Sequence, residues 1–130
     1  MRYLGIDYGD KRLGLSISDQ SNSFAFPRDT IDNDAKAFET LRRIVELEEV
    51  AEVVVGDTRT TNGGANAITA SADLFVKKLE QNISVPVARA REAWSSQEAA
   101  RFAPQGDKHN DASAAAIILQ RFLDSRKKSE

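Results

Sequence analysis

The stretch that decides the fold is YLGIDYGDKRLGLSIS, residues 3–18. Apolar side chains alternate with small or polar ones in both halves of this stretch, at Leu4, Ile6, Leu13, Leu15 and Ile17. A period of two is typical of a half-buried β-strand. Gly9-Asp10 lies between the halves and is a turn signal. Residues 3–18 therefore predict a β-hairpin.

Downstream of the hairpin, residues 23–26 can form a third strand, which Pro27 is expected to end. The pattern then changes to helical spacing, at Phe38, Leu41, Ile44 and Val45, after Asn33-Asp34, which can supply an N-cap. Residues 52–56 contain the apolar, β-branched run Val53-Val54-Val55, as expected for a central strand covered on both faces.

The second half of the chain continues this alternation. Residues 65–79 predict a helix, Val85-Pro86-Val87 a short strand at an edge, and residues 95–102 another helix. A final helix is expected from Asp111, with residues 125–130 as a frayed tail. Residues 1–124 are thus expected to form one α/β domain. Its mixed sheet would be antiparallel first and then parallel, with helices on both faces.

Composition excludes several classes of function. The 130 residues include no cysteine, which rules out thiolate zinc sites, iron–sulfur clusters and a cysteine nucleophile. The net charge of −2 gives no global basic field, so any binding to nucleic acid requires a local patch. No apolar run approaches a membrane span of about 20 residues, and an acid follows the start too early for a signal peptide. We expect a cytoplasmic domain with no membrane partner.

Three carboxylates are candidates for a site. Asp7 is near the end of the first strand, Glu92 follows the short strand, and Asp111 begins the last helix. Each also has an ordinary interpretation, respectively as a turn residue, a surface ion-pair partner and a helix cap. Together they would form an all-oxygen site, which suits Mg²⁺ or Mn²⁺ rather than zinc. Such ions can activate water against a phosphodiester.

Basic side chains accompany these acids along the chain. Those expected near the cleft are Lys11, Arg12, Arg59, Arg89, Arg91 and Lys108. They could contact phosphates despite the net charge, or they could be ordinary solvated charges. Lys11 and Arg12 in the hairpin turn are the first choice for nucleic-acid binding.

Two segments of the chain also resemble a known family. LGIDYGDKRLGLS at residues 4–16 and NDASAAAIILQRFLD at residues 110–124 are similar to the first and last motifs of the YqgF (RuvX) family. This family is described both as Holliday-junction resolvases and as nucleases that mature the 5′ end of pre-16S rRNA. Residues 53–56 and 62–64 occupy the places of its middle strand and glycine turn, so the resemblance runs from about residue 3 to 124.

The resemblance implies an RNase H-like fold and metal-dependent hydrolysis of phosphodiester bonds. Asp7 falls on the family's first catalytic Asp, and Asp111 on its last. The family's middle motif, Asp-Glu-Arg-Leu-Thr-Thr, corresponds to residues 91–96. Glu92 is retained there, while the preceding acid is Arg91 and the following arginine is Ala93.

Three functions remain open on these residues. The first is a nuclease that processes the 5′ end of pre-16S rRNA or resolves Holliday junctions, as a monomer or a homodimer. The altered middle motif motivates the second, a catalytically impaired module that binds nucleic acid or the ribosome. The third is a phosphate-loop domain of the actin and sugar-kinase type, which shares the hairpin Asp7-Tyr8-Gly9. Those proteins need two such domains to enclose ATP, so this function ranks last.

Overall fold

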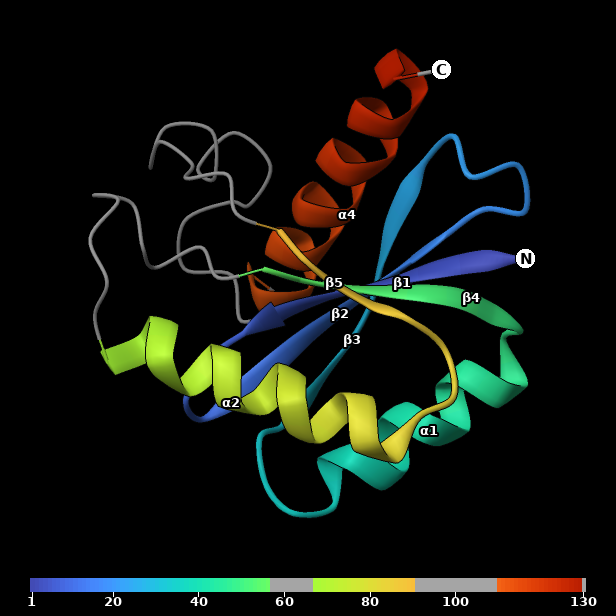
Figure 1. Ribbon diagram of the computed structural model, residues 1–130. Helices are drawn as coiled ribbons and strands as arrows, with labels where there is room; N and C mark the ends of the chain where they lie inside the picture. The colour runs from blue at the N-terminus through green and yellow to red at the C-terminus, as the bar shows by residue number, and fades with distance from the viewer. Residues whose placement is uncertain (57–66, 91–109, 130) are drawn as a thin grey trace.

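The computed structural model describes residues 1–56, 67–90 and 110–129, with side chains given for 1–56, 70–90 and 112–125 (Figure 1). The elements in chain order are β1 (Arg2–Tyr8), β2 (Arg12–Ser18), β3 (Ala25–Asp32), α1 (Ala37–Leu47), β4 (Val50–Gly56), α2 (Ala67–Asn82), β5 (Val87–Arg89) and α4 (Asn110–Ser129). Within these ranges no helix is long and apolar enough to cross a membrane.

The strands form a five-stranded mixed sheet in the order β3-β2-β1-β4-β5. β1 pairs antiparallel with β2, and β2 with β3, whereas β1–β4 and β4–β5 are parallel. The predicted hairpin and the predicted change from antiparallel to parallel pairing are both confirmed. β1 is central and carries the residue pattern that defines the two faces of the sheet.

Each face of the sheet is covered by helices, as the sequence predicts (Figure 1). Leu4, Ile6 and Tyr8 of β1 belong to a core that also holds the buried residues of α1 and α2. On the opposite face, α4 packs its apolar residues around Val54 of β4. Because successive side chains of a strand point to opposite faces, Gly5 and Asp7 lie on the α4 face.

The prediction that Pro27 ends the third strand is wrong, because β3 continues through Pro27 to Asp32. β3 lies at the edge of the described sheet, where a missing N–H costs no ladder hydrogen bond on the open side. Pro27 pairs with Ser16, directly beside a register shift between Leu15 and Ser16. The edge position and the irregularity together accommodate the proline.

The ends of other elements differ slightly from expectation. Lys36, rather than Asn33 or Asp34, is the N-cap of α1, and Asp34 Oδ1 instead accepts the Lys36 N–H at 3.0 Å. β5 begins at Val87, directly after Pro86, so it starts two residues later than the predicted strand Val85-Pro86-Val87 and overlaps it at Val87. α4 is helical as far as Ser129, where the sequence predicts a frayed tail. The helix predicted at residues 95–102 lies outside the described residues.

Candidate active site

Asp7 is the penultimate residue of β1 and is 7% exposed. Its partner in β2 is Gly14, and its partner in β4 is Gly56. Side chains of paired residues share one face of a sheet, so the two neighbours of Asp7 on the α4 face carry no side chain. The Asp7 carboxylate is therefore flanked by glycine on both sides at the carboxyl end of β1.

The glycines also allow α4 to lie close to the sheet. A Cβ on Gly56 would come within 2.7 Å of Ile118 Cδ1. A Cβ on Gly5 would come within 2.8 Å of Leu119 Cβ and 3.0 Å of the Ala115 carbonyl oxygen. Real Cβ atoms do not approach so closely, so a side chain at either position would force its neighbours to shift. The sheet and the helix meet almost backbone to backbone beside Asp7.

The direction of α4 over β1 follows from its contacts. Near the start of β1, the Tyr3 ring packs edge-on against Phe122, with 5.9 Å between ring centroids. Further along the strand, Gly5 faces Leu119 and Ala115. Advancing along β1 toward Asp7 therefore means moving back along α4 toward its first turn, which contains the backbone of residue 111.

The hairpin turn after Asp7 carries two exposed cations, Lys11 and Arg12. Asn33, just beyond β3, holds this turn by two hydrogen bonds. Its Nδ2 donates to the Gly9 carbonyl oxygen at 2.7 Å, and its backbone N–H donates to the Lys11 carbonyl oxygen at 3.0 Å. The sequence suggested only a helix cap for Asn33. An asparagine just after a strand is a turn signal, but its partner in another turn cannot be read from it.

Most of the remaining predicted site residues lie in parts of the chain that the structure does not describe. Glu92, Arg59, Arg91 and Lys108 lie outside the described residues, as does the Asp111 side chain. Within the described part of the chain, no three histidine or acidic side chains are grouped so that they could hold a metal. Of the three predicted carboxylates, Asp7 is thus the one whose surroundings are described. Asp7 and the cations Lys11 and Arg12 are brought together at one end of the sheet.

Arg89 has a structural contact that the sequence did not indicate. Its Nε lies 3.3 Å from Asp73 Oδ1 of α2, and its Nη1 donates to the Val55 carbonyl oxygen at 3.3 Å. The side chain is 18% exposed. Arg89 therefore joins the end of β5 to β4 and α2, which leaves it less available for phosphate than a solvated arginine.

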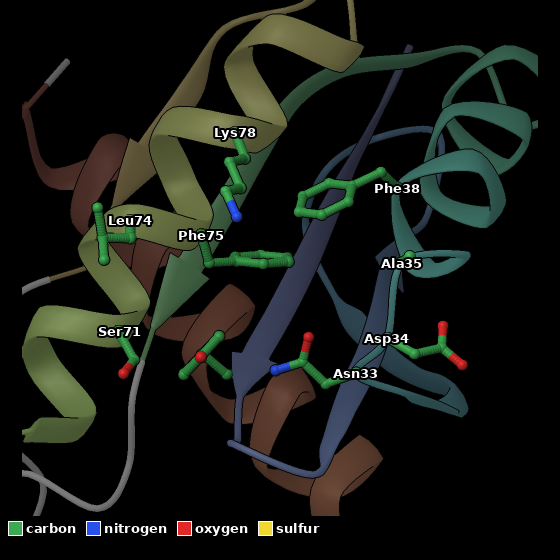
Figure 2. A pocket seen from close by; sticks show the side chains of 9 residues that line it. Asn33, Asp34, Ala35, Phe38, Ser71, Leu74, Phe75 and Lys78 are labelled. Atoms are coloured by element: carbon green, nitrogen blue, oxygen red, sulfur yellow. The ribbon is translucent and has the colours of Figure 1, made fainter.

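A groove that the sequence did not predict opens on the other face of the sheet, beside Tyr8 (Figure 2). Its volume is about 510 Å³. It is lined by residues of α1, α2 and the segment that precedes α1, together with the end of β1: Tyr8, Asn33, Asp34, Ala35, Phe38, Ser71, Leu74, Phe75 and Lys78. Phe38 and Phe75 follow helical spacing in the sequence, which identified them only as core residues.

Comparison with known proteins adds a family and a fold. Residues 1–125 match the family model RuvX, described as Holliday junction resolvase. A protein from Chlorobium luteolum, named "Putative pre-16S rRNA nuclease", is 36% identical over 136 residues, which cover 97% of this chain and 96% of that protein.

Two solved structures are similar in fold. Thermus thermophilus RuvC has a TM-score of 0.54 at 16% identity, covering 98% of this chain and 97% of that one. Fowlpox virus resolvase, solved with substrate Holliday junction DNA, has a TM-score of 0.55 at 13% identity, covering 97% and 99%. At these identities the likeness concerns the fold alone, and it confirms the RNase H-like class. With the match of its sequence over residues 1–125, the chain belongs to the RuvX family.

Proposed function

We propose that this chain is a divalent-metal-dependent nuclease that hydrolyses phosphodiester bonds in structured nucleic acid. The observation that carries the proposal is the position of Asp7, a buried carboxylate flanked by Gly14 and Gly56 at the carboxyl end of β1. By the resemblance of residues 4–16 to the family's first motif, Asp7 falls on its first catalytic Asp, and the chain belongs to that family over residues 1–125. Glu92 and Asp111 are proposed as the other two carboxylates.

The direction of α4 supports the inclusion of Asp111. From Gly5 to Asp7 the strand advances by two residues, or about 6.6 Å. From Ala115 back to residue 111 the helix retreats by four residues, or about 6 Å. Because α4 runs opposite to β1 and Ala115 faces Gly5, these similar steps are expected to bring the backbone of residue 111 near the level of Asp7. Residues four apart also share a face of a helix.

The donor set fits a hard cation. Carboxylate oxygens are the ligands that Mg²⁺ and Mn²⁺ prefer, and the glycines paired with Asp7 place no side chain beside its carboxylate from β2 or β4. A bound ion of this kind supplies positive charge that activates water and stabilises the leaving oxygen of a phosphodiester. Asp7, Glu92 and Asp111 would hold it.

The protein's own cations would position the substrate. Lys11 and Arg12 are exposed on the turn that follows Asp7, and Asn33 fixes the backbone of that turn. Contacts of lysine and arginine with phosphates set the register of a strand without reading its sequence. Arg59, Arg91 and Lys108 are proposed as further phosphate contacts.

The 5′ end of pre-16S rRNA is the first substrate to test, with branched DNA as the second. The relative from C. luteolum that is named for the rRNA activity is 36% identical to this chain, whereas the two resolvases are 16% and 13% identical. We propose a cytoplasmic location, where both substrates occur in a bacterium. Cutting a four-way junction in pairs would require a homodimer, whereas trimming an rRNA end would not.

A second candidate function is supported by the middle motif. Arg91 and Ala93 replace an acid and an arginine of the family pattern around Glu92. Loss of a bidentate arginine contact to phosphate weakens the positioning of the strand. The second candidate is therefore a catalytically impaired member that binds nucleic acid or the ribosome.

The two candidates are separated by a cleavage assay with a pre-16S 5′ leader RNA and a four-way DNA junction, in Mg²⁺ or Mn²⁺. We expect cleavage by the wild-type chain and its loss in Asp7→Asn. Asp29→Asn, the same change on the exposed strand β3, is the matched control and should cleave as the wild type does. Binding of either substrate without cleavage in any divalent ion would favour the impaired module. Equal cleavage by the Asp7→Asn protein would contradict the assignment of the site.

A further inference from the structure

The groove between α1 and α2 has an aromatic floor. The Phe75 ring centroid is 5.3 Å from that of Tyr8 and 5.4 Å from that of Phe38, and the Phe38 and Phe75 rings are stacked. Phe75 is buried, whereas Phe38 is partly exposed. With a volume of about 510 Å³, the groove falls in the range of sites that bind small molecules, which is about 300–1,000 Å³.

Polar groups converge over this floor. Figure 2 shows the Lys78 ammonium group and the Asn33 amide directed into the space beside the Phe75 ring, while the Asp34 carboxylate turns away from it. Tyr8 also lines the groove, and the residue is 7% exposed. Among the residues that the structure describes, its hydroxyl has no hydrogen-bond partner. In the described part of the chain, Thr30 Oγ1 is the fully enclosed side-chain oxygen without a partner, so the Tyr8 hydroxyl is not sealed off and can meet a ligand in the groove.

The groove adjoins the proposed active site through the backbone. Tyr8 follows Asp7 in β1, so their Cα atoms are about 3.8 Å apart, and the alternation of the strand turns Asp7 toward α4 and Tyr8 toward the groove. The turn with Lys11 and Arg12 lies just beyond both residues. A nucleic-acid strand that crosses this end of the sheet can therefore have a phosphate on one side of β1 and a base on the other.

We propose that the groove binds one unpaired nucleobase next to the phosphate that is cut, which rests on the nuclease function proposed above. Phe38 supplies an apolar surface for the face of the base, and the Tyr8 hydroxyl bonds to its edge. Lys78 pairs with the adjoining phosphate, which matches the charge of the ligand. A base held in a stacked duplex cannot enter such a groove, so the substrate is single-stranded or unpaired at this position.

The test uses the full-length chain in EDTA, so that binding is measured without cleavage. The probe is a short fluorescent single-stranded oligonucleotide, and affinity is followed by anisotropy at several salt concentrations. Tyr8→Phe keeps the ring and removes one hydrogen bond, so affinity should fall roughly three- to tenfold. Lys78→Gln should reduce the slope of log affinity against log salt by about 0.7, the value for one phosphate contact on a single strand.

Lys77→Gln is the matched control, since Lys77 is an exposed neighbour on α2 that does not line the groove. Its salt slope should equal that of the wild type. Wild-type affinity in both the Tyr8→Phe and Lys78→Gln proteins would overturn the proposal, as would the absence of any binding by the wild-type chain.

An abasic scan of the probe identifies the base that is bound. Each nucleotide of the probe in turn is replaced by an abasic one. At one position the replacement should lower the affinity of the wild-type chain but should not lower the affinity of the Tyr8→Phe protein any further. Fully additive losses at every position would overturn the groove as a base site, even if the chain cleaves RNA in Mg²⁺. Non-additive losses of affinity in EDTA, without any cleavage in Mg²⁺, would support the groove as a base site and contradict the nuclease function. The two failures are therefore distinguishable.

Discussion

Ser16 Oγ donates a hydrogen bond of 2.7 Å to the carbonyl oxygen of Ala115, 99 residues further along the chain. Ser16 is completely buried, and it lies on the same face of the sheet as its partner Gly5 and, two residues further along β1, Asp7. The bond fixes the position of α4 along the hairpin. The level at which the first turn of α4 meets Asp7 therefore depends on it.

Ser16→Ala should lower the free energy of unfolding by about 1 kcal/mol, the usual value of one buried neutral hydrogen bond. The Ala115 carbonyl keeps its bond within the helix, so the loss should not be much larger. Urea denaturation measures the difference, with Ser84→Ala at an exposed position as control. A Ser16→Ala protein as stable as the control would show that the bond does not fix α4.

The two glycines under α4 should differ in their tolerance of a methyl group. A Cβ at Gly5 would meet the helix backbone at the Ala115 carbonyl oxygen, 3.0 Å away, which can move only with α4 itself. A Cβ at Gly56 would meet only the Ile118 side chain, the nearest atom being Cδ1 at 2.7 Å. Gly5→Ala should therefore cost about 1–3 kcal/mol of stability or more, as overpacking does.

Gly56→Ala should cost less than Gly5→Ala, because an isoleucine side chain can change its rotamer. Adding Ile118→Val should restore part of the stability that Gly56→Ala loses, and none of the stability that Gly5→Ala loses. Thermal unfolding of the wild type, the two glycine variants and each glycine variant combined with Ile118→Val measures this order. The reverse order of cost would contradict the described packing of α4 on β1.

Asp19 provides a prediction of pH dependence. A hydrogen bond from the Ser21 hydroxyl, and bonds from the Phe24 and Ser23 backbone N–H groups, stabilise its carboxylate and lower its pKa below the ordinary 3.8. A carboxylate with a lowered pKa stabilises the fold above the ordinary value, and that contribution is lost as the pH falls through the lowered pKa.

An NMR titration of the Asp19 side chain should thus give a midpoint below 3.8, and Ser21→Ala should move the midpoint upward. The shift should shrink only slightly in high salt, because hydrogen bonds rather than distant charges cause it. A midpoint at or above the ordinary value would mean that the turn after β2 does not hold these bonds in solution.

Local periodicity was sufficient to predict the hairpin, the described helices α1, α2 and α4, and the mixed sheet. Leu4, Ile6 and Leu13 alternate, and Leu41, Ile44 and Val45 recur at helical spacing, so each element is encoded within its own residues. The error at Pro27 has a different origin. Whether a proline interrupts a strand depends on whether that strand lies at an edge, and strand order is a property of the whole chain.

The sequence names the acids and turn cations of the candidate site, but not the surroundings of Asp7. Asp7 stands out in the sequence, but its flanking by Gly14 and Gly56 depends on the register of two strand pairs, which no local pattern specifies. The groove could not be foreseen, because Phe38 and Phe75 have the same spacing whether they fill a core or line an opening. The Asn33 contact with the hairpin turn links residues 24 positions apart, and the sequence of neither segment indicates the other as its partner.

The central claim is that Asp7, Glu92 and Asp111 together form one site that binds a hard cation. Titration calorimetry with Mn²⁺ tests this claim most directly. The wild-type chain should bind Mn²⁺, and Asp7→Asn, Glu92→Gln and Asp111→Asn should each abolish or greatly weaken binding, while Asp29→Asn leaves it unchanged. Wild-type Mn²⁺ affinity in the Asp7→Asn protein, or no Mn²⁺ binding by the wild-type chain, would contradict the account.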